Sequence, residues 1–382
     1  MAAFQPGIDV LLGRHRRWLA GARAGLVSHL AAVDARGAPS AERLRQCRGC
    51  RLAALFGPEH GFAGAAGAGA RVGHRRHPEW GIPIYSLYGA TRRPAPEVFR
   101  ELDLLVFDLQ DLGARPYTYV STLRYVLEAA AAAAKPVIVA DRPIPLPRVT
   151  DGPLLDEALT SFVGAIPAPM AYGMTPGETA LWLRRKLKLD ADVRVAPMAG
   201  YRRQAGRDAD WPPWLPPSPG IRAWETGRCY LATVFSEALS AVDIGRGTNL
   251  AFQVFGAAWM QAPPVLDWLR RQDLPGVNFY RHPYQPAGGG RLLDGVRLTV
   301  DDPAGFRPVT TSLAIIDCLQ KLYGIGKIWR TAGVRPEFFD QLYGDTRTRR
   351  ELQAGAGWRE ISAGWRGALR RFNAGRREVL LY

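Results

Sequence analysis

Two short apolar runs constrain the fold of this chain most strongly. They span residues 52–56 and 102–107, and each breaks directly into polar, glycine-containing sequence. Such runs are typical of strands buried on both faces of a parallel sheet. Glu59 and His60 follow the first run, and the second is followed by Asp108, Gln110 and Asp111. Because open α/β sheets bind ligands beyond the carboxyl ends of their strands, we expect a functional site here.

Further strands and helices alternate with these runs. Strands are predicted over residues 24–30, 82–87 and 136–140. Helices are predicted over residues 39–46, 96–101 and 122–134, the last with Ser121 as its N-cap. The alternation favours an α/β fold with a Rossmann-like parallel sheet, in which His29, Glu59, Gln110 and Asp141 share one edge.

The nucleotide-binding signatures that often accompany such a sheet are missing. No Gly-x-Gly-x-x-Gly motif opens a helix after the first strand, and no Walker motif occurs. Residues 61–73 are rich in Gly and Ala and favour a mobile loop at the site over a packed element. No cluster of His, Cys and carboxylates suggests a metal site. We therefore expect neither a cofactor nor a metal.

The second half of the chain predicts a separate, smaller domain. The proline-rich stretch at 211–219 reads as a linker, because clustered prolines do not fit a sheet or a helix interior. We expect a Rossmann-like domain over residues 1–226 and a smaller α/β domain over 227–382. The second domain should contain strands over 230–235 and 295–300, a GRGTN turn at 245–249 and a helix over 311–323.

Composition bears mainly on possible partners and compartment. The net charge of +15 and the pI of about 10.1 would suit an anionic partner, but the Lys and Arg residues are scattered and no nucleic-acid-binding motif appears. We therefore expect no nucleic-acid partner. Four cysteines are too few for a disulfide framework, and we see neither a signal-peptide core nor a membrane-spanning run. We expect a cytoplasmic location.

Several motifs together carry a family resemblance. FGPEHGFAG, IPIYSLYG, VFDLQDLGARPYTYVSTL, DRPIPL, YGMTPGE, PPSP and GRGT occur in this order along almost the whole chain. They resemble the exo-β-N-acetylmuramidase family of NamZ or YbbC type. The resemblance implies two domains with the active cleft between them, and release of N-acetylmuramic acid from the non-reducing end of peptidoglycan fragments. The segment EALSAVDI before GRGT departs from the family pattern. A catalytically inactive binder of cell-wall sugars is therefore the alternative.

With this resemblance, individual residues acquire expected roles. Glycoside hydrolysis generally needs a proton donor and a second group at the anomeric carbon. Glu59 is the expected acid, and Glu178 is the candidate second carboxylate. However, Thr175-Pro-Gly-Glu178 also reads as a complete capping box. The substrate's acetamido group could instead act as the nucleophile.

The remaining candidates would bind substrate. An arginine would suit the lactyl carboxylate of N-acetylmuramic acid, and Arg115 is preferred over Arg246 because it follows the second apolar run closely. One of Tyr117 and Tyr119 would stack on a sugar ring. The other expected substrate-binding residues are His60, Asp108, Gln110, Asp111, Asp141 and Glu237.

Overall fold

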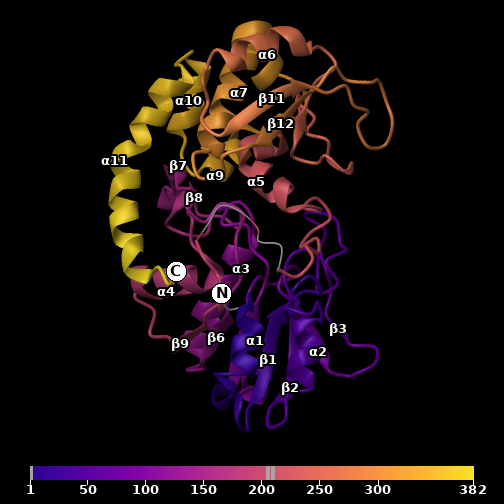
Figure 1. Cartoon of the computed structure of the whole chain (residues 1–382), viewed down its shortest axis with the longest axis vertical. Coiled ribbons are helices and arrows are strands. Elements are labelled where there is room, and N and C mark those ends of the chain that lie inside the picture. Colours follow the sequence, from indigo (N-terminus) through magenta and orange to yellow (C-terminus); the bar gives the residue numbers. More distant parts are fainter. Residues whose placement is uncertain (1–2, 204–206, 208–210) are drawn as a thin grey trace.

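The computed structural model describes residues 3–203, 207 and 211–382. Within these ranges the chain is an α/β protein whose largest sheet has the strand order β3-β4-β2-β1-β5-β6-β9 (Figure 1). Its strands are β1 (Arg23–Ser28), β2 (Arg51–Gly57), β3 (Arg75–Arg76), β4 (Pro83–Ser86), β5 (Leu104–Asp108), β6 (Val137–Ala140) and β9 (Val193–Ala196). Neighbouring strands pair in parallel, apart from β3, which runs antiparallel to β4. The predicted Rossmann-like sheet is confirmed.

Helices cover both faces of this sheet, which explains its apolar strands. In β5, Leu105 and Phe107 pack in one hydrophobic core, whereas Leu104 and Val106 pack in another. The first core includes α3 (Tyr119–Ala132) and α4 (Pro176–Lys186), and the second includes α1 (Gly7–Leu12) and α2 (Ser40–Arg45). Strands buried on both sides lose the polar alternation of a half-exposed strand.

The order of the strands places a topological switch point between β1 and β5. From β1 the chain adds β2 and β4 on one side, then returns to add β5, β6 and β9 on the other. At this point the backbone N–H of Gln110 donates to Nε2 of His29 at 3.1 Å. Loops after the carboxyl ends of the strands meet here, as in other open α/β sheets.

One predicted helix start is wrong. Helix α3 begins at Tyr119 with Thr118 at the N-cap position, three residues before the predicted start. The hydroxyl of Ser121 donates to the carbonyl oxygen of Phe162 at 2.7 Å and does not cap the helix.

The start of the second part also differs from the prediction. Residues 230–235 were expected as a strand, but they belong to α5 (Trp224–Thr233) and the 3₁₀ helix η4 (Val234–Glu237). A short apolar run is compatible with a buried helix as well as with a buried strand. Here α5 is buried because it packs against α7 (Pro308–Tyr323) and β12 (Val296–Val300).

The rest of the second part is a small sheet covered by helices. Strands β10 (Val254–Phe255), β12 and β11 (Val277–Arg281) form an antiparallel sheet. The predicted strand at 295–300 and helix at 311–323 correspond to β12 and α7. The other helices are α6 (Ala262–Arg270), α8 (Ile325–Trp329), α9 (Pro336–Tyr343), α10 (Arg347–Gln353) and α11 (Trp358–Arg376).

Helix α11 returns along the outside of the molecule from the second part to the first (Figure 1). It packs against α7 and against β7 (Asp151–Leu154), which pairs with β8 (Pro169–Ala171). The short 3₁₀ helices among the described residues are η1 (Arg16–Leu19), η2 (Pro96–Glu101), η3 (Glu157–Leu159), η4 and η5 (Arg377–Val379). Among the helices of the described ranges, none has both the length and the apolar composition needed to cross a bilayer.

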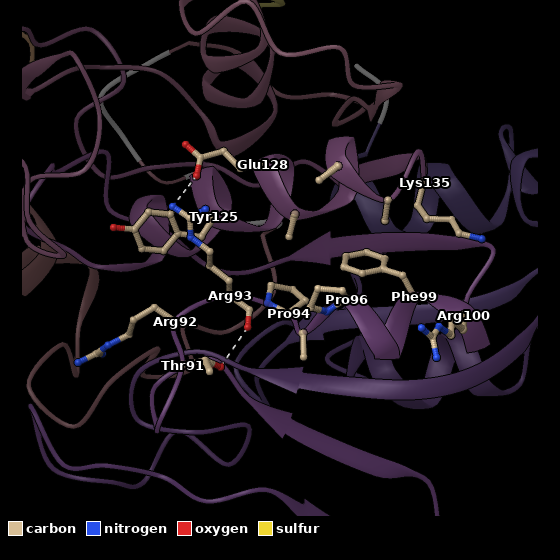
Figure 2. A pocket seen from close by; sticks show the side chains of 14 residues that line it. Thr91, Arg92, Arg93, Pro94, Pro96, Phe99, Arg100, Tyr125, Glu128 and Lys135 are labelled. Carbon is tan, nitrogen blue, oxygen red and sulfur yellow. Dashed lines mark hydrogen bonds and ion pairs between the residues drawn. The ribbon is translucent and has the colours of Figure 1, made fainter.

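A surface groove remains between η2 and α3 on one side of the large sheet. Figure 2 shows Pro94, Pro96 and Phe99 on one wall and the side chains of α3 on the other. The cavity measures about 1000 Å³.

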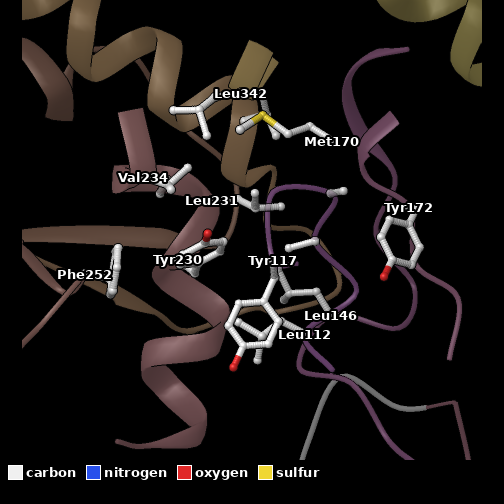
Figure 3. Packing of buried hydrophobic residues seen from close by; sticks show 14 of the residues in the cluster. Leu112, Tyr117, Leu146, Met170, Tyr172, Tyr230, Leu231, Val234, Phe252 and Leu342 are labelled. Carbon is white, nitrogen blue, oxygen red and sulfur yellow. The ribbon is translucent and has the colours of Figure 1, made fainter. Parts of the chain in front are cut away.

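Apolar side chains of the two parts also pack against each other. Figure 3 shows Leu112 and Tyr117 of the first part beside Tyr230 and Leu231 of α5. These residues belong to one continuous hydrophobic cluster. The loops at the carboxyl ends of the strands therefore pack against the second part as well as against the large sheet.

Candidate active site between the two parts

A pocket of about 490 Å³ lies where loops from the large sheet meet η4 and the turns that follow it. Residues 59, 60, 88, 117 and 118 supply one side of it. Residues of the second part supply the other side, among them Tyr230, Glu237, Arg246, Phe252, Arg335 and Phe338. Ser218, Gly220 and Arg222, from the segment that joins the parts, complete the lining.

Glu59 is held in place by donors from two different loops. The hydroxyl of Thr118 donates to its Oε2 at 2.7 Å, and the backbone N–H of Gly69 donates to its Oε1 at 2.8 Å. The side chain lines the pocket although the residue is only 8% exposed. The Gly- and Ala-rich loop thus contributes directly to the position of this carboxylate.

His60 turns the chain directly after Glu59. Its φ is +71°, a left-handed conformation that is uncommon for residues other than glycine. Its Nδ1 lies 2.7 Å from the carbonyl oxygen of Ala66, an atom that can only accept, so Nδ1 carries the proton. Non-glycine residues in such conformations cluster at functional sites.

Glu237 is a second carboxylate that lines the same pocket. It forms an ion pair with Arg246 at 3.2 Å, and its side chain is 22% exposed. Burial raises the pKa of Glu237; Arg246 opposes this effect and the negative charge of Glu59 adds to it. The Arg335 guanidinium donates to the backbone carbonyl of Glu237 at 2.6 Å and further fixes η4.

Aromatic rings also line the pocket, among them those of Tyr88, Tyr117 and Tyr230. The ring centroids of Tyr117 and Tyr119 lie 4.7 Å apart. Tyr117 also meets Tyr230 edge-on, with the two ring centroids 5.8 Å apart (Figure 3). Tyr117 lines the pocket. Tyr119 is buried, and its hydroxyl donates to the carbonyl oxygen of Pro217. Of the two tyrosines, the structure therefore places only Tyr117 where a sugar could stack.

The structure corrects the assignment of Arg115. Its side chain is completely buried and lies outside the pocket. The guanidinium donates to the backbone carbonyls of Pro153 and Ala168, and to those of Leu342 and Tyr343 at the end of α9. Through these hydrogen bonds Arg115 connects the first part of the chain to the second. We therefore remove it from the substrate-binding candidates.

Glu178 also has structural partners. With Thr175 it forms the predicted capping box at the start of α4, and its Oε2 accepts the Thr175 backbone N–H at 2.9 Å. Its Oε1 accepts from Arg203 and from the backbone N–H of Leu381. Glu178 is fully buried and does not line the pocket, so we remove it as a catalytic candidate.

Four other candidates at the strand ends lie outside the pocket as well. Asp108 pairs with Arg142, and Asp111 accepts a hydrogen bond from the hydroxyl of Tyr172 at 2.8 Å. The side-chain amide of Gln110 donates to the backbone carbonyls of Asp111 and Pro143. The fourth, Asp141, is buried at the start of α4. The expectation that these residues bind substrate, with at least one of Asp108 and Asp111 facing the cleft, is corrected, because each one satisfies a buried polar group.

The sequence analysis missed several pocket residues. Tyr88 follows β4 in the same way that Glu59 follows β2, so its position past a strand end was an available signal. Thr118 could be found only through its contact with Glu59. Arg222 and Arg335 carry no local sequence signal. Among the described residues, no group of three or more His, Cys, Asp or Glu side chains is placed to hold a metal ion.

Comparisons with known proteins agree with this architecture. Residues 24–225 match the model of the N-terminal part of exo-beta-N-acetylmuramidase NamZ, and residues 228–382 match that of its C-terminal part. The chain is 35% identical over 382 residues to the peptidoglycan beta-N-acetylmuramidase NamZ of Bacillus subtilis (strain 168), covering 99% of this chain and 91% of that protein.

Solved structures of two proteins from Bacteroides fragilis NCTC 9343, both described as DUF1343 family proteins, have the same fold. One superposes with a TM-score of 0.93 at 30% identity and covers 100% of both chains. The other gives a TM-score of 0.76 at 26% identity, over 100% of this chain and 99% of that one. With both halves matched along nearly their whole length, the chain belongs to the NamZ family of exo-β-N-acetylmuramidases.

Proposed function

We propose that this chain is an exo-acting glycoside hydrolase that releases N-acetylmuramic acid from the non-reducing end of peptidoglycan-derived fragments. The observation that carries the proposal is the pocket of about 490 Å³ in which Glu59 and Glu237 meet from the two parts of the chain. Its size falls within the range of about 300–1,000 Å³ that is usual for small-molecule sites. Membership of the NamZ family supports the same reaction and substrate. We also propose that the domain boundary lies after residue 226.

Glu59 is the proton donor in this proposal. The Gly69 N–H holds Oε1 as an acceptor, whereas Oε2 faces the hydroxyl of Thr118, which can either donate or accept. Oε2 can therefore carry the proton that the leaving oxygen receives when the bond to the anomeric carbon breaks. Water then adds to the sugar, and its proton returns to Glu59.

Glu237 is the second carboxylate and takes the place that the sequence analysis gave to Glu178. As a carboxylate it stabilises the positive charge that develops on the sugar ring, or positions the acetamido group if that group attacks the anomeric carbon. Burial raises the pKa of Glu237, and the ion pair with Arg246 opposes this rise and so favours the charged form that this role requires.

Arg246 remains the candidate ligand for the lactyl carboxylate. Its side chain is 44% exposed and lines the pocket, so its guanidinium can reach a bound sugar. His60 and Tyr117 are the other predicted residues that line the pocket, and we propose that they contact the substrate. A planar guanidinium matches the geometry of a carboxylate and would separate the muramide from the glucosaminide.

The inactive-binder alternative rested on the segment EALSAVDI. That segment begins with Glu237, which lines the pocket and pairs with Arg246 of the GRGT turn. The altered sequence thus still supplies a carboxylate to the site, which favours the enzyme over the binder.

The roles of the carboxylates can be separated through the leaving group. We would measure kcat for the wild type, Glu59→Gln and Glu237→Gln on a nitrophenyl β-N-acetylmuramide and on a MurNAc–GlcNAc disaccharide. Nitrophenolate leaves with little protonation, so loss of the proton donor should impair the disaccharide more than the chromogenic substrate. The proposal expects this pattern for Glu59→Gln, and similar losses on both substrates for Glu237→Gln. The reverse pattern would exchange the two roles, and a wild type inactive on both substrates would refute the proposed function.

A further inference from the structure

Tyr88 lies in the catalytic pocket at the same level of the large sheet as Glu59. Strands β2 and β4 pair in parallel, with Gly57 opposite Ser86. Glu59 is the second residue after Gly57, and Tyr88 is the second residue after Ser86. Both residues line the pocket. The register of the two strands therefore brings this tyrosine to the proposed proton donor.

The backbone of Tyr88 is fixed by the same loop that holds Glu59. The N–H of Tyr88 donates to the hydroxyl of Ser86 at 3.1 Å, and its carbonyl oxygen accepts the N–H of Val72 at 2.9 Å. Gly69, in the same Gly- and Ala-rich loop as Val72, donates its N–H to Glu59 at 2.8 Å. Because one loop is hydrogen-bonded to both residues, the position of Tyr88 is linked to that of Glu59.

The hydroxyl of Tyr88 interacts with the carboxylate of Glu59. Burial raises the pKa of Tyr88; the negative charge of Glu59 and a hydrogen bond to its side chain add to this rise, and Arg92 opposes it. A phenol whose pKa lies above the usual value of about 10 keeps its proton at neutral pH. Because an ionised carboxylate can only accept, the Tyr88 hydroxyl is the donor in this contact.

A cation and a second aromatic ring pack against Tyr88. The guanidinium of Arg92 lies 3.4 Å from the ring centroid of Tyr88 and 4.4 Å from that of Phe162. The centroids of the two rings are 5.4 Å apart. These contacts hold the ring in place, and the positive charge beside it makes the phenol a better hydrogen-bond donor.

We propose that Tyr88 is a positioning residue for Glu59, whose hydroxyl orients the carboxyl group and stabilises the carboxylate that remains after proton transfer. The inference rests on the proposed function and adds a residue to it. In the step concerned, the O–H bond of Glu59 breaks and its proton bonds to the leaving oxygen. The bond between that oxygen and the anomeric carbon breaks, and its electron pair stays with the oxygen.

Tyr88 keeps its own proton throughout this step. Its hydrogen bond becomes stronger as negative charge develops on Glu59, because a bond to a charged acceptor is stronger than one to a neutral acceptor. An interaction that is stronger in the transition state than in the ground state accelerates the reaction.

The test removes the hydroxyl and compares two leaving groups. We would measure kcat/KM as a function of pH on the MurNAc–GlcNAc disaccharide and on the nitrophenyl β-N-acetylmuramide. Tyr88→Phe keeps the ring that packs on Arg92 and Phe162. Tyr85→Phe is the matched control: it removes a hydroxyl from β4 at a residue outside the pocket, whose ring packs beside that of Phe56.

Tyr88→Phe should lose roughly tenfold on the disaccharide and stay within about twofold of the wild type on the nitrophenyl substrate, whose leaving group needs little protonation. The basic limb of the pH profile on the disaccharide should move to higher pH by about one unit. This limb reports loss of the proton from the catalytic acid, and an acid whose carboxylate loses a donor keeps its proton to higher pH. Tyr85→Phe should change neither quantity.

The same substitution in a Glu59→Gln background shows whether Tyr88 acts through Glu59. Without a carboxylate to stabilise, Tyr88→Phe should add no more than about twofold to the loss that Glu59→Gln causes on the disaccharide. A direct contact of Tyr88 with the substrate would instead give a further loss of roughly tenfold.

Arg92→Met is a second variant, which keeps the Tyr88 hydroxyl but removes the cation from its ring. It should show a smaller loss with the same preference for the disaccharide. Its control is Arg93→Met, because the Arg93 guanidinium lies 4.7 Å from the ring centroid of another tyrosine, Tyr125, which is outside the pocket.

Three results for Tyr88→Phe would each overturn the inference: equal losses on the two substrates, an unchanged basic limb, or a further tenfold loss in the Glu59→Gln background. The same changes in Tyr85→Phe would overturn it as well, because they would reflect the loss of any nearby hydroxyl. A wild type without turnover on both substrates would instead refute the proposed function, and the inference about Tyr88 with it.

Discussion

Glu59 and Glu178 were the two carboxylates that the sequence analysis considered for catalysis, and their environments differ. Glu59 is held by a hydroxyl and a backbone N–H at the wall of the pocket, whereas Glu178 is enclosed by Thr175, Arg203 and Leu381. The capping box of Glu178 could be predicted because its partners are three residues apart. The partners of Arg115 lie 38 or more residues away, so its burial could not be predicted.

Replacement of Glu178 by Gln should lower stability and spare activity. Gln can still close the capping box, but Arg203 loses its charged partner. We expect the free energy of unfolding to fall by about 1–3 kcal/mol, measured by urea denaturation. The kcat of the folded variant on the chromogenic muramide should stay within a few-fold of the wild type. A loss of more than a hundredfold at unchanged stability would return Glu178 to the mechanism.

Arg246 should determine selectivity for the lactyl carboxylate. A charge-assisted hydrogen bond of about 1.5–3 kcal/mol corresponds to roughly ten- to a hundredfold. Arg246→Leu should reduce the ratio of kcat/KM for the muramide to that for the glucosaminide by this factor. Because Arg246 also pairs with Glu237, both substrates should lose some activity, so the ratio is the informative quantity. An unchanged ratio would show that Arg246 only supports Glu237.

At the level of elements, the N-terminus of α4 contains a pH-sensitive contact. Burial, with the nearby charge of Glu178, raises the pKa of Asp141 to about 7. Its carboxylate accepts from the Gly177 N–H at 2.7 Å and from the hydroxyls of Thr175 and Tyr382 at 2.7 and 2.8 Å. Because the folded-state pKa lies above the unfolded value, the folded protein retains the proton over the window between about pH 4 and pH 7.

Asp141 should therefore make stability fall as the pH rises through that window. The contribution is fully present below the unfolded pKa and is lost as the pH rises through the folded one, with a slope of at most about 1.4 kcal/mol per pH unit. Asp141→Asn removes this contribution, whereas other titrating groups, such as the buried His29, cancel when the two proteins are compared. Urea denaturation at several pH values from 4 to 8 should give a difference between the two proteins that changes across the window. A constant difference would contradict the raised pKa.

Elements were predictable where their signals were local. Strands β1, β2, β4, β5 and β6 of the large sheet come from apolar runs that end in polar residues, and they were found close to their observed bounds. The edge strands β3, which consists of two exposed arginines, and β9 were not predicted. Residues 230–235 were misread because their apolar and β-branched side chains suit a buried strand equally well. These residues form a helix that is buried against α7 and β12, and both of these elements lie much further along the chain. The local sequence does not contain that information.

For the whole molecule, the position of the second part relative to the sheet determines the pocket. Asp151 of β7 accepts the backbone N–H groups of Val309 and Thr310, both at 2.8 Å, at the start of α7. Thr150 and Asn373 connect the same region to α11. These contacts, together with Arg115, fix the side of the pocket that carries Glu237 opposite the side that carries Glu59. The sequence pattern predicted two α/β parts, and the family resemblance implied a cleft between them. The return of α11 was not predicted, because its contacts depend on the packing of the complete chain.

The central claim is that this pocket performs the hydrolysis, and the most direct test compares the glutamates at residues 59 and 178. Release of N-acetylmuramic acid from the MurNAc–GlcNAc disaccharide would be measured for the wild type, Glu59→Gln and Glu178→Gln, each confirmed as folded by circular dichroism. The account expects Glu59→Gln to lose about a hundredfold to ten-thousandfold in turnover, the usual effect of losing a catalytic acid or base, while Glu178→Gln stays close to the wild type. A folded Glu59→Gln protein with near-normal turnover would contradict the account.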